Sequence, residues 1–175
     1  SPMIAGAAAL VRQAQPALDP LEVKAVLMNA TVPLSNLSGV KYSTGVVGGG
    51  RVDVRRAVTA QATAAVDIST GEVGLSFGSV IATETVTVER TFAVTNHGIA
   101  SASYDLAVEP TFELPGATIV VEPAQVDLAP GATETVTLTL TLDPVVLGSP
   151  GPDPGTPPTQ GNQSPQARHY LNQTS

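Results

Sequence analysis

An unbroken run of apolar and small side chains opens the chain. From Met3 to Ala14 nearly every residue is apolar, alanine or glycine. A helix that is apolar on every side is buried on every side, and Pro2 suits its first turn because the missing amide hydrogen is not needed there. The pattern therefore predicts a buried helix over this stretch, in which Gly6 and the alanines let neighbouring backbones come close.

A second helix has clear start signals. Asp19 is a good N-cap residue, Pro20 occupies the first helical position, and Glu22 lies three residues after the cap, as in a capping box. The apolar residues that follow keep a helical period, and they are Val23, Val26, Leu27 and Ala30. We therefore predict a helix that begins at Pro20.

A glycine cluster, Gly48-Gly49-Gly50, precedes a third helical stretch that ends near Val58. Such a turn can hold a phosphate group. Here no Gly-Lys-Ser/Thr follows, and no strand-glycine-helix fingerprint has the required spacing. The pattern favours a tight turn in which one backbone packs closely on another.

Apolar and polar residues alternate in the next part of the chain. In Thr85–Asn96 and Thr133–Leu142 the apolar residues stand at even positions, and most odd positions hold threonine or glutamate. This period of two is typical of half-buried antiparallel strands. Shorter alternations follow the same rule, at Tyr104–Val108, Ile119–Val121 and Val126–Leu128. Several short strands separated by turn signals predict a β-sandwich.

Charge and composition divide the chain into three blocks. The net charge is +3 over residues 1–60, −10 over 61–147 and 0 over 148–175. The last block is dense in proline and glycine, which cannot support a ladder or a helix. We predict a helical part over 1–62, a sandwich over 65–147, and a Pro/Gly-rich linker or truncated tail over 148–175.

Composition excludes several classes of function. The chain has 175 residues, no cysteine and a net charge of −7. It therefore lacks disulfides and thiolate ligands, and its charge argues against nucleic acid or an anionic membrane as a partner. The chain contains no run of 18 apolar residues, so we expect no segment of it to span a bilayer. Because the chain does not begin with Met and carries no signal peptide, we expect it to be a piece of a longer protein.

Few side chains are placed for chemistry. His97 lies in an Asn-His-Gly turn, where we expect it to be solvated, and His169 lies in the tail. Neither has a serine and a carboxylate at motif spacing. No His-Glu-x-x-His or Asp-x-Asp-x-Asp pattern is present, so we predict no metal site and no cofactor. Arg90 interrupts the inward face of its strand, and we expect it at a strand edge or paired with a neighbouring acid.

Three segments, in order along the chain, carry a family resemblance. The opening Ser1–Val11 resembles the helix that follows the nucleophile in subtilisin-like serine proteases, with Pro2, Ile4, Ala5 and Gly6 at matching positions. Pro16–Thr31 resembles the next helix of that family. Gly48–Val58 resembles its closing Gly-x-Gly-x-Val-Asn/Asp-x-x-x-Ala-Val motif. This part of the chain thus resembles the C-terminal end of a subtilase catalytic domain.

The resemblance implies a secreted or cell-surface serine endopeptidase that acts on proteins or peptides. The nucleophilic Ser would lie three residues before Ser1, and the His, the Asp and the oxyanion-hole Asn would lie further upstream. No catalytic residue is then present here, and we predict no activity of this chain alone. Pro2, Ile4, Ala5 and Gly6 would support the helix that holds the nucleophile, and the segment would pack against the missing N-terminal part of the catalytic domain.

Folding of the separate parts follows from the same reasoning. Residues 1–60 would lack the parallel sheet that they should cover, so alone they would expose apolar surface and aggregate or stay loose. Residues 65–147 would fold independently. Hydrogen exchange tests this, because equal protection of Met3–Val11 and Thr133–Leu142 would contradict it.

The alternating part of the chain carries a second likeness. Thr91–Asn96 and Leu128–Gly131 resemble the fibronectin type III-like domains that follow the catalytic domain in many secreted subtilases. The predicted fold class is therefore α+β, with the C-terminal helices of a subtilisin-like α/β domain followed by an antiparallel sandwich. One alternative is a non-catalytic extracellular binding or adhesion module. Carbohydrate binding is disfavoured, because three Tyr, three Phe and no Trp offer few stacking platforms.

Overall fold

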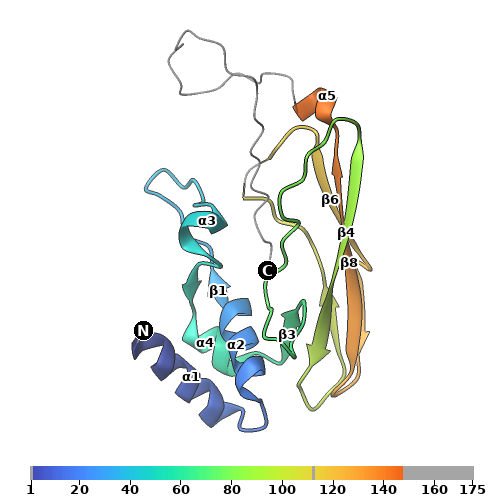
Figure 1. Ribbon diagram of the computed structural model, residues 1–175. Coiled ribbons are helices and arrows are strands. Elements are labelled where there is room, and N and C mark those ends of the chain that lie inside the picture. The colour runs from blue at the N-terminus through green and yellow to red at the C-terminus, as the bar shows by residue number, and fades with distance from the viewer. Residues whose placement is uncertain (1, 112, 148–175) are drawn as a thin grey trace.

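A computed structural model describes residues 2–111 and 113–147 of the chain. Its helices are α1 (Pro2–Ala14), α2 (Pro20–Asn29), α3 (Thr44–Val47), α4 (Val54–Thr59) and α5 (Pro144–Leu147). Its strands are β1 (Thr31–Val32), β2 (Arg51–Val52), β3 (Ala62–Ala65), β4 (Val86–Asn96), β5 (Ala102–Asp105), β6 (Ala117–Glu122), β7 (Gln125–Leu128) and β8 (Thr133–Leu142). The fold is mixed α+β, with helices α1, α2 and α4 gathered beside the long strands (Figure 1). The predictions for Ser1, His169 and the tail over 148–175 lie outside the described residues.

The start of α2 confirms the predicted capping box. The Asp19 carboxylate accepts hydrogen bonds from the backbone amides of Leu21 (2.7 Å) and Glu22 (2.8 Å). The Glu22 carboxylate in turn accepts one from the Asp19 amide at 2.7 Å. Three of the amides that a helix start leaves without an intrahelical partner are thus satisfied locally, which fixes where α2 begins.

Replacing Asp19 by alanine should lower the free energy of unfolding by about 1 kcal/mol, because the N-cap acceptor is lost. Asp19→Asn is the matched control, since asparagine caps about as well as aspartate. Urea unfolding followed by far-UV circular dichroism measures both. A loss in the asparagine variant as large as in the alanine variant would show that charge, and not capping, stabilises this helix.

The helices enclose a small core of their own. Its buried residues come from α1, the α1–α2 connection, α2 with its C-cap, and α4: Ala7, Val11, Leu18, Val23, Val26, Leu27, Ala30 and Ala57. Only Ala7 and Val11 of α1 are buried, whereas Met3 is 81% exposed and Leu10 50% exposed. The prediction that α1 is buried on all sides is therefore wrong in this structure, because the contacts of α1 with α2 and α4 bury only one side of it.

The glycine cluster forms the tight turn that the sequence predicts. Strands β1 and β2 pair antiparallel, with Thr31 opposite Val52 and Val32 opposite Arg51. Gly50 has a φ of +113°, and a Cβ placed there would lie 2.3 Å from the Val32 carbonyl oxygen. Only glycine allows the two backbones to approach this closely. The turn leads into α4, whose N-cap Asp53 accepts a hydrogen bond from the Arg56 amide at 3.1 Å.

The remaining strands form two antiparallel sheets. One has the order β3-β4-β8-β6, and the other pairs β5 with β7. The two long alternations became β4 and β8, as predicted, and the shorter ones became β6 and β7. Strand β5 ends at Asp105, earlier than the alternation suggests, so Leu106 and Val108 lie beyond it. The sequence pattern does not predict β3, which crosses the proposed boundary at 62–65 and pairs with the end of β4.

Residues from both sheets share one apolar cluster. Val94 of β4 and Val136 of β8 pack with Val126 and Leu128 of β7. A second cluster contains Leu75, Phe77 and three alternate residues of β8, namely Leu138, Leu140 and Leu142. The period of two in β8 is thus the period of its burial.

Arg90 lies at a sheet edge, which is the first of its two predicted environments. Strand β3 pairs with Ala93–Asn96 of β4 and does not reach Arg90. Among the described strands, the part of β4 around Arg90 therefore pairs on one side alone, with β8. The Arg90 side chain is exposed, and its Nη1 donates to the Glu89 carbonyl oxygen at 3.0 Å. A charge at this place tolerates solvent and discourages pairing with another chain.

Candidate functional site

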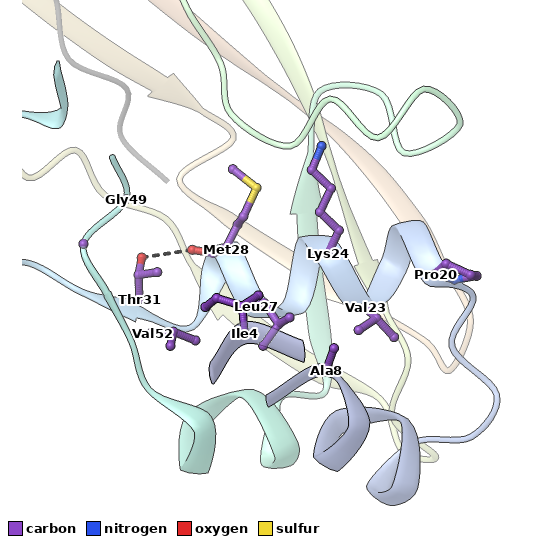
Figure 2. A pocket seen from close by; sticks show the side chains of 11 residues that line it. Ile4, Ala8, Pro20, Val23, Lys24, Leu27, Met28, Thr31, Gly49 and Val52 are labelled. Atoms are coloured by element: carbon purple, nitrogen blue, oxygen red, sulfur yellow. Dashed lines mark hydrogen bonds between the residues drawn. The ribbon is translucent and has the colours of Figure 1, made fainter. Parts of the chain in front are cut away.

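The helical part contains an apolar cavity. A volume of about 410 Å³ lies between α1, α2 and the turn that joins α3 to β2 (Figure 2). Ile4 and Ala8 of α1 form one wall, and Val23 and Leu27 of α2 line it together with Val52 of β2. Such a lining suits an apolar side chain better than a charged ligand.

The polar groups at the cavity are already engaged. The Lys24 amino group donates to the Gly71 carbonyl oxygen at 2.6 Å, so its charge is directed at the turn over 67–72. The Thr31 hydroxyl donates to the Met28 carbonyl oxygen at 2.9 Å (Figure 2). The one ionisable side chain of this lining, Lys24, is thus already hydrogen-bonded elsewhere, and the cavity is better suited to packing than to catalysis.

The predicted support residues Pro2, Ile4, Ala5 and Gly6 lie in the first two turns of α1, and all four are exposed. Of these, Ile4 lines the cavity. No atom outside the helix lies within 4 Å of a Cβ placed on Gly6, so the predicted close backbone approach is not formed by the described residues. Their role in supporting a nucleophile stays a prediction.

The surroundings of His97 differ from those that the sequence predicts. Its side chain is only 16% exposed, so the prediction of a solvated turn residue is wrong. Nε2 lies 2.9 Å from the Thr63 hydroxyl, and Nδ1 lies 3.8 Å from a Glu22 carboxylate oxygen. No local pattern predicts these contacts, because the partners lie 34 and 75 positions earlier in the chain.

Hydroxyl, imidazole and carboxylate in this order invite comparison with a catalytic triad. The geometry argues against that function. The gap of 3.8 Å between His97 and Glu22 exceeds hydrogen-bond reach. Thr63 is only 5% exposed, and it does not line the cavity, so its hydroxyl is poorly placed to attack a substrate carbonyl. The three residues join α2, β3 and the turn after β4, which is a structural arrangement.

Two exposed carboxyl groups have lowered pKa values for local reasons. The hydroxyl and the amide of Ser69 both donate to Asp67, at 2.6 and 2.9 Å, and lower the pKa of its carboxyl. A hydrogen bond and the charge of Lys41 lower the pKa of Glu109. A carboxyl group whose pKa is lowered in the folded state stabilises that state at pH values above its ordinary pKa. This stabilisation is lost as the pH falls through the pKa of the folded state.

Within residues 2–111 and 113–147, no group of three His, Cys, Asp or Glu side chains could hold a metal ion. Over the same part of the chain, no helix is both long and apolar enough to cross a membrane.

Comparison with known proteins bears on the helical part. Residues 1–72 match the sequence model of the subtilase family, peptidase S8. The match includes α1 to α4, β3 and the turn that contains Gly71. No curated protein matches the chain. The similarity to subtilases thus covers residues 1–72, which include the residues that line the cavity and most of the Glu22–Thr63–His97 arrangement.

Proposed function

We propose that this chain is the C-terminal part of a secreted or cell-surface subtilisin-like serine endopeptidase. The observation that carries the proposal is the subtilase match over residues 1–72. The order of the motifs supports it, since the Pro2–Gly6 helix start, the capped helix at Pro20 and the glycine turn before Asp53 follow one another as in that family. The substrate class would be proteins or peptides.

In this proposal the chain positions the nucleophile and does not itself form or break bonds. Acyl transfer needs a serine, a histidine that moves its proton, an aspartate that holds the imidazole, and donors for the oxyanion. The serine would precede Pro2, at the N-terminal end of α1, where free amides and the positive end of the helix dipole favour developing negative charge. Ala7 and Val11 anchor α1 on α2 and α4, which would hold that end in place.

The apolar surface of α1 would meet the rest of the catalytic domain. Met3 is 81% exposed and Ile4 44% exposed, and the cavity opens beside Ile4. Exposed apolar surface next to a hollow is typical of an interface that another element covers. The missing N-terminal part of the catalytic domain, inferred from the family, is the element that we propose for it.

For residues 65–147 we propose a fibronectin type III-like sandwich that serves as an accessory domain. What supports this is the apolar cluster that Val94 and Val136 of the four-stranded sheet share with Val126 and Leu128 of the β5–β7 pair. An inner layer built from two antiparallel sheets is the defining feature of a sandwich.

The coding sequence upstream of Ser1 tests the proposal directly. We expect Gly-Thr-Ser-Met-Ala there, with the histidine and aspartate motifs further upstream. We also expect the longer protein to react with a fluorophosphonate probe at that serine, and its alanine variant to remain unlabelled. The purified chain of 175 residues should hydrolyse no peptide or ester substrate above a buffer blank.

A different upstream sequence would overturn the proposal and favour a non-catalytic extracellular module. Hydrolysis by the purified chain alone would also contradict it, because it would place the active site within these residues.

A further inference from the structure

Helix α2 presents two opposite faces to two different parts of the molecule. Val23 and Leu27 face the helical core and the cavity. Glu22, Ala25 and Asn29 are spaced by three and four residues, so they share the other face. Ala25 is fully buried and yet does not belong to the helical core. That face is therefore covered by something other than α1 and α4.

Asn29 shows what covers it. Its side-chain amide donates to the Ala64 carbonyl oxygen at 3.1 Å, and its side-chain oxygen accepts from the Ala64 amide at 2.8 Å. Ala64 stands opposite Val94 in the β3–β4 pair. Its backbone amide and carbonyl oxygen nevertheless bond to the Asn29 side chain and not to β4. Asn29 thus takes the place that a further strand would occupy at the edge of the four-stranded sheet, and it satisfies an edge that is otherwise open.

Contacts made by the first turns of α2 extend the same junction. His97, in the turn after β4, lies against Thr63 of β3 and Glu22 of α2. Two residues after Glu22, the Lys24 amino group donates to the Gly71 carbonyl oxygen at 2.6 Å. A Cβ on Gly71 would lie 3.0 Å from the Leu21 side chain, so the turn packs directly against α2.

We propose that these contacts form a fixed junction that makes α2 and the four-stranded sheet one cooperative unit, with Asn29 as the positioning residue that holds β3. The inference is independent of the proteolytic function, because it rests on contacts within this chain. It also departs from the expectation that residues 65–147 fold independently, since the sheet would be stabilised through α2.

Hydrogen exchange on the full chain, followed by mass spectrometry, tests the coupling. Val136→Ala in β8 weakens the sheet core without touching α2, because Val136 packs in the cluster shared by β4, β7 and β8. We expect it to speed exchange in both β8 and α2 by a similar factor, on the order of tenfold. In an Asn29→Ala background, the same change should speed exchange in β8 and leave α2 unaffected. If Val136→Ala in the otherwise unchanged chain leaves the exchange rates of α2 unaltered, the proposal is overturned.

Two further comparisons serve as a control and as a replacement for Asn29→Ala. Met28→Ala truncates a neighbouring side chain of α2 that lines the cavity, so it should preserve the coupling that Asn29→Ala removes. Should Asn29→Ala prevent folding, Gly71→Ala and Gly78→Ala replace it. Both glycines have a φ above +70°, but only at Gly71 would the new Cβ meet α2. The proposal is supported if Val136→Ala speeds exchange in α2 less in the Gly71→Ala background than in the Gly78→Ala background. An equal effect of Val136→Ala on α2 in the two backgrounds contradicts it.

Discussion

Gly50→Ala should lower the free energy of unfolding by about 3 kcal/mol, as expected for left-handed backbone strain combined with a steric clash. The new Cβ would lie 2.3 Å from the Val32 carbonyl oxygen and 2.9 Å from the carbonyl carbon. Both are backbone atoms of β1, which cannot move aside as the end of a side chain can. Because β1 follows directly on α2, the distortion should spread to the helical core. Urea unfolding followed at 222 nm measures the loss.

Gly39→Ala is the matched control for this variant. Gly39 has a φ of +81°, so alanine is strained there too, but nothing lies within 4 Å of the added Cβ. The expected loss is about 1–2 kcal/mol, from the backbone alone. Equal losses at Gly50 and Gly39 would show that the close approach to β1 carries no energetic weight.

Asn96→Ala should lower the free energy of unfolding by about 3 kcal/mol or more, because it strands several buried polar groups. Asn96 is fully buried at the end of β4. Its side-chain amide donates to the carbonyl oxygens of Ala100 (2.9 Å) and Leu128 (3.0 Å), and its side-chain oxygen accepts from the Gly98 amide at 2.8 Å. One side chain thus ties the turn after β4 to the end of β7. Thermal unfolding with a near-UV signal reports this loss.

Asn36→Ala provides the comparison for Asn96→Ala. The Asn36 side-chain oxygen accepts hydrogen bonds from two backbone amides, those of Ser38 (2.9 Å) and Val40 (3.0 Å), but on an exposed loop. Water can replace these bonds, so we expect a loss of about 1 kcal/mol at most. A loss at Asn36 that equals the loss at Asn96 would mean that burial does not set the cost.

Local signals in the sequence were sufficient for some elements and not for others. The start of α2 was predictable because Asp19, Pro20 and Glu22 act within one turn. Strands β4 and β8 were predictable because their alternation records which face is buried. Strand β3 was not, since Ala62–Ala65 has no large apolar residue and becomes a strand only by pairing with β4.

The candidate site was predicted less well than the fold. Helical periodicity placed Val23 and Leu27 on an apolar face, and both line the cavity. The cavity itself depends on which faces of α1 and α2 their neighbours leave uncovered, and no local pattern encodes that. The environment of His97 depends on Glu22 and Thr63, which only the tertiary fold brings near it.

The two faces of α2 have a consequence for how such a chain can change over evolutionary time. Val23 and Leu27 belong to one side, and Ala25 and Asn29 to the other. Substitutions on the Asn29 side alter the contact with the sheet and leave the packing of Val23 and Leu27 in the helical core in place. The two sides of one helix can therefore diverge separately.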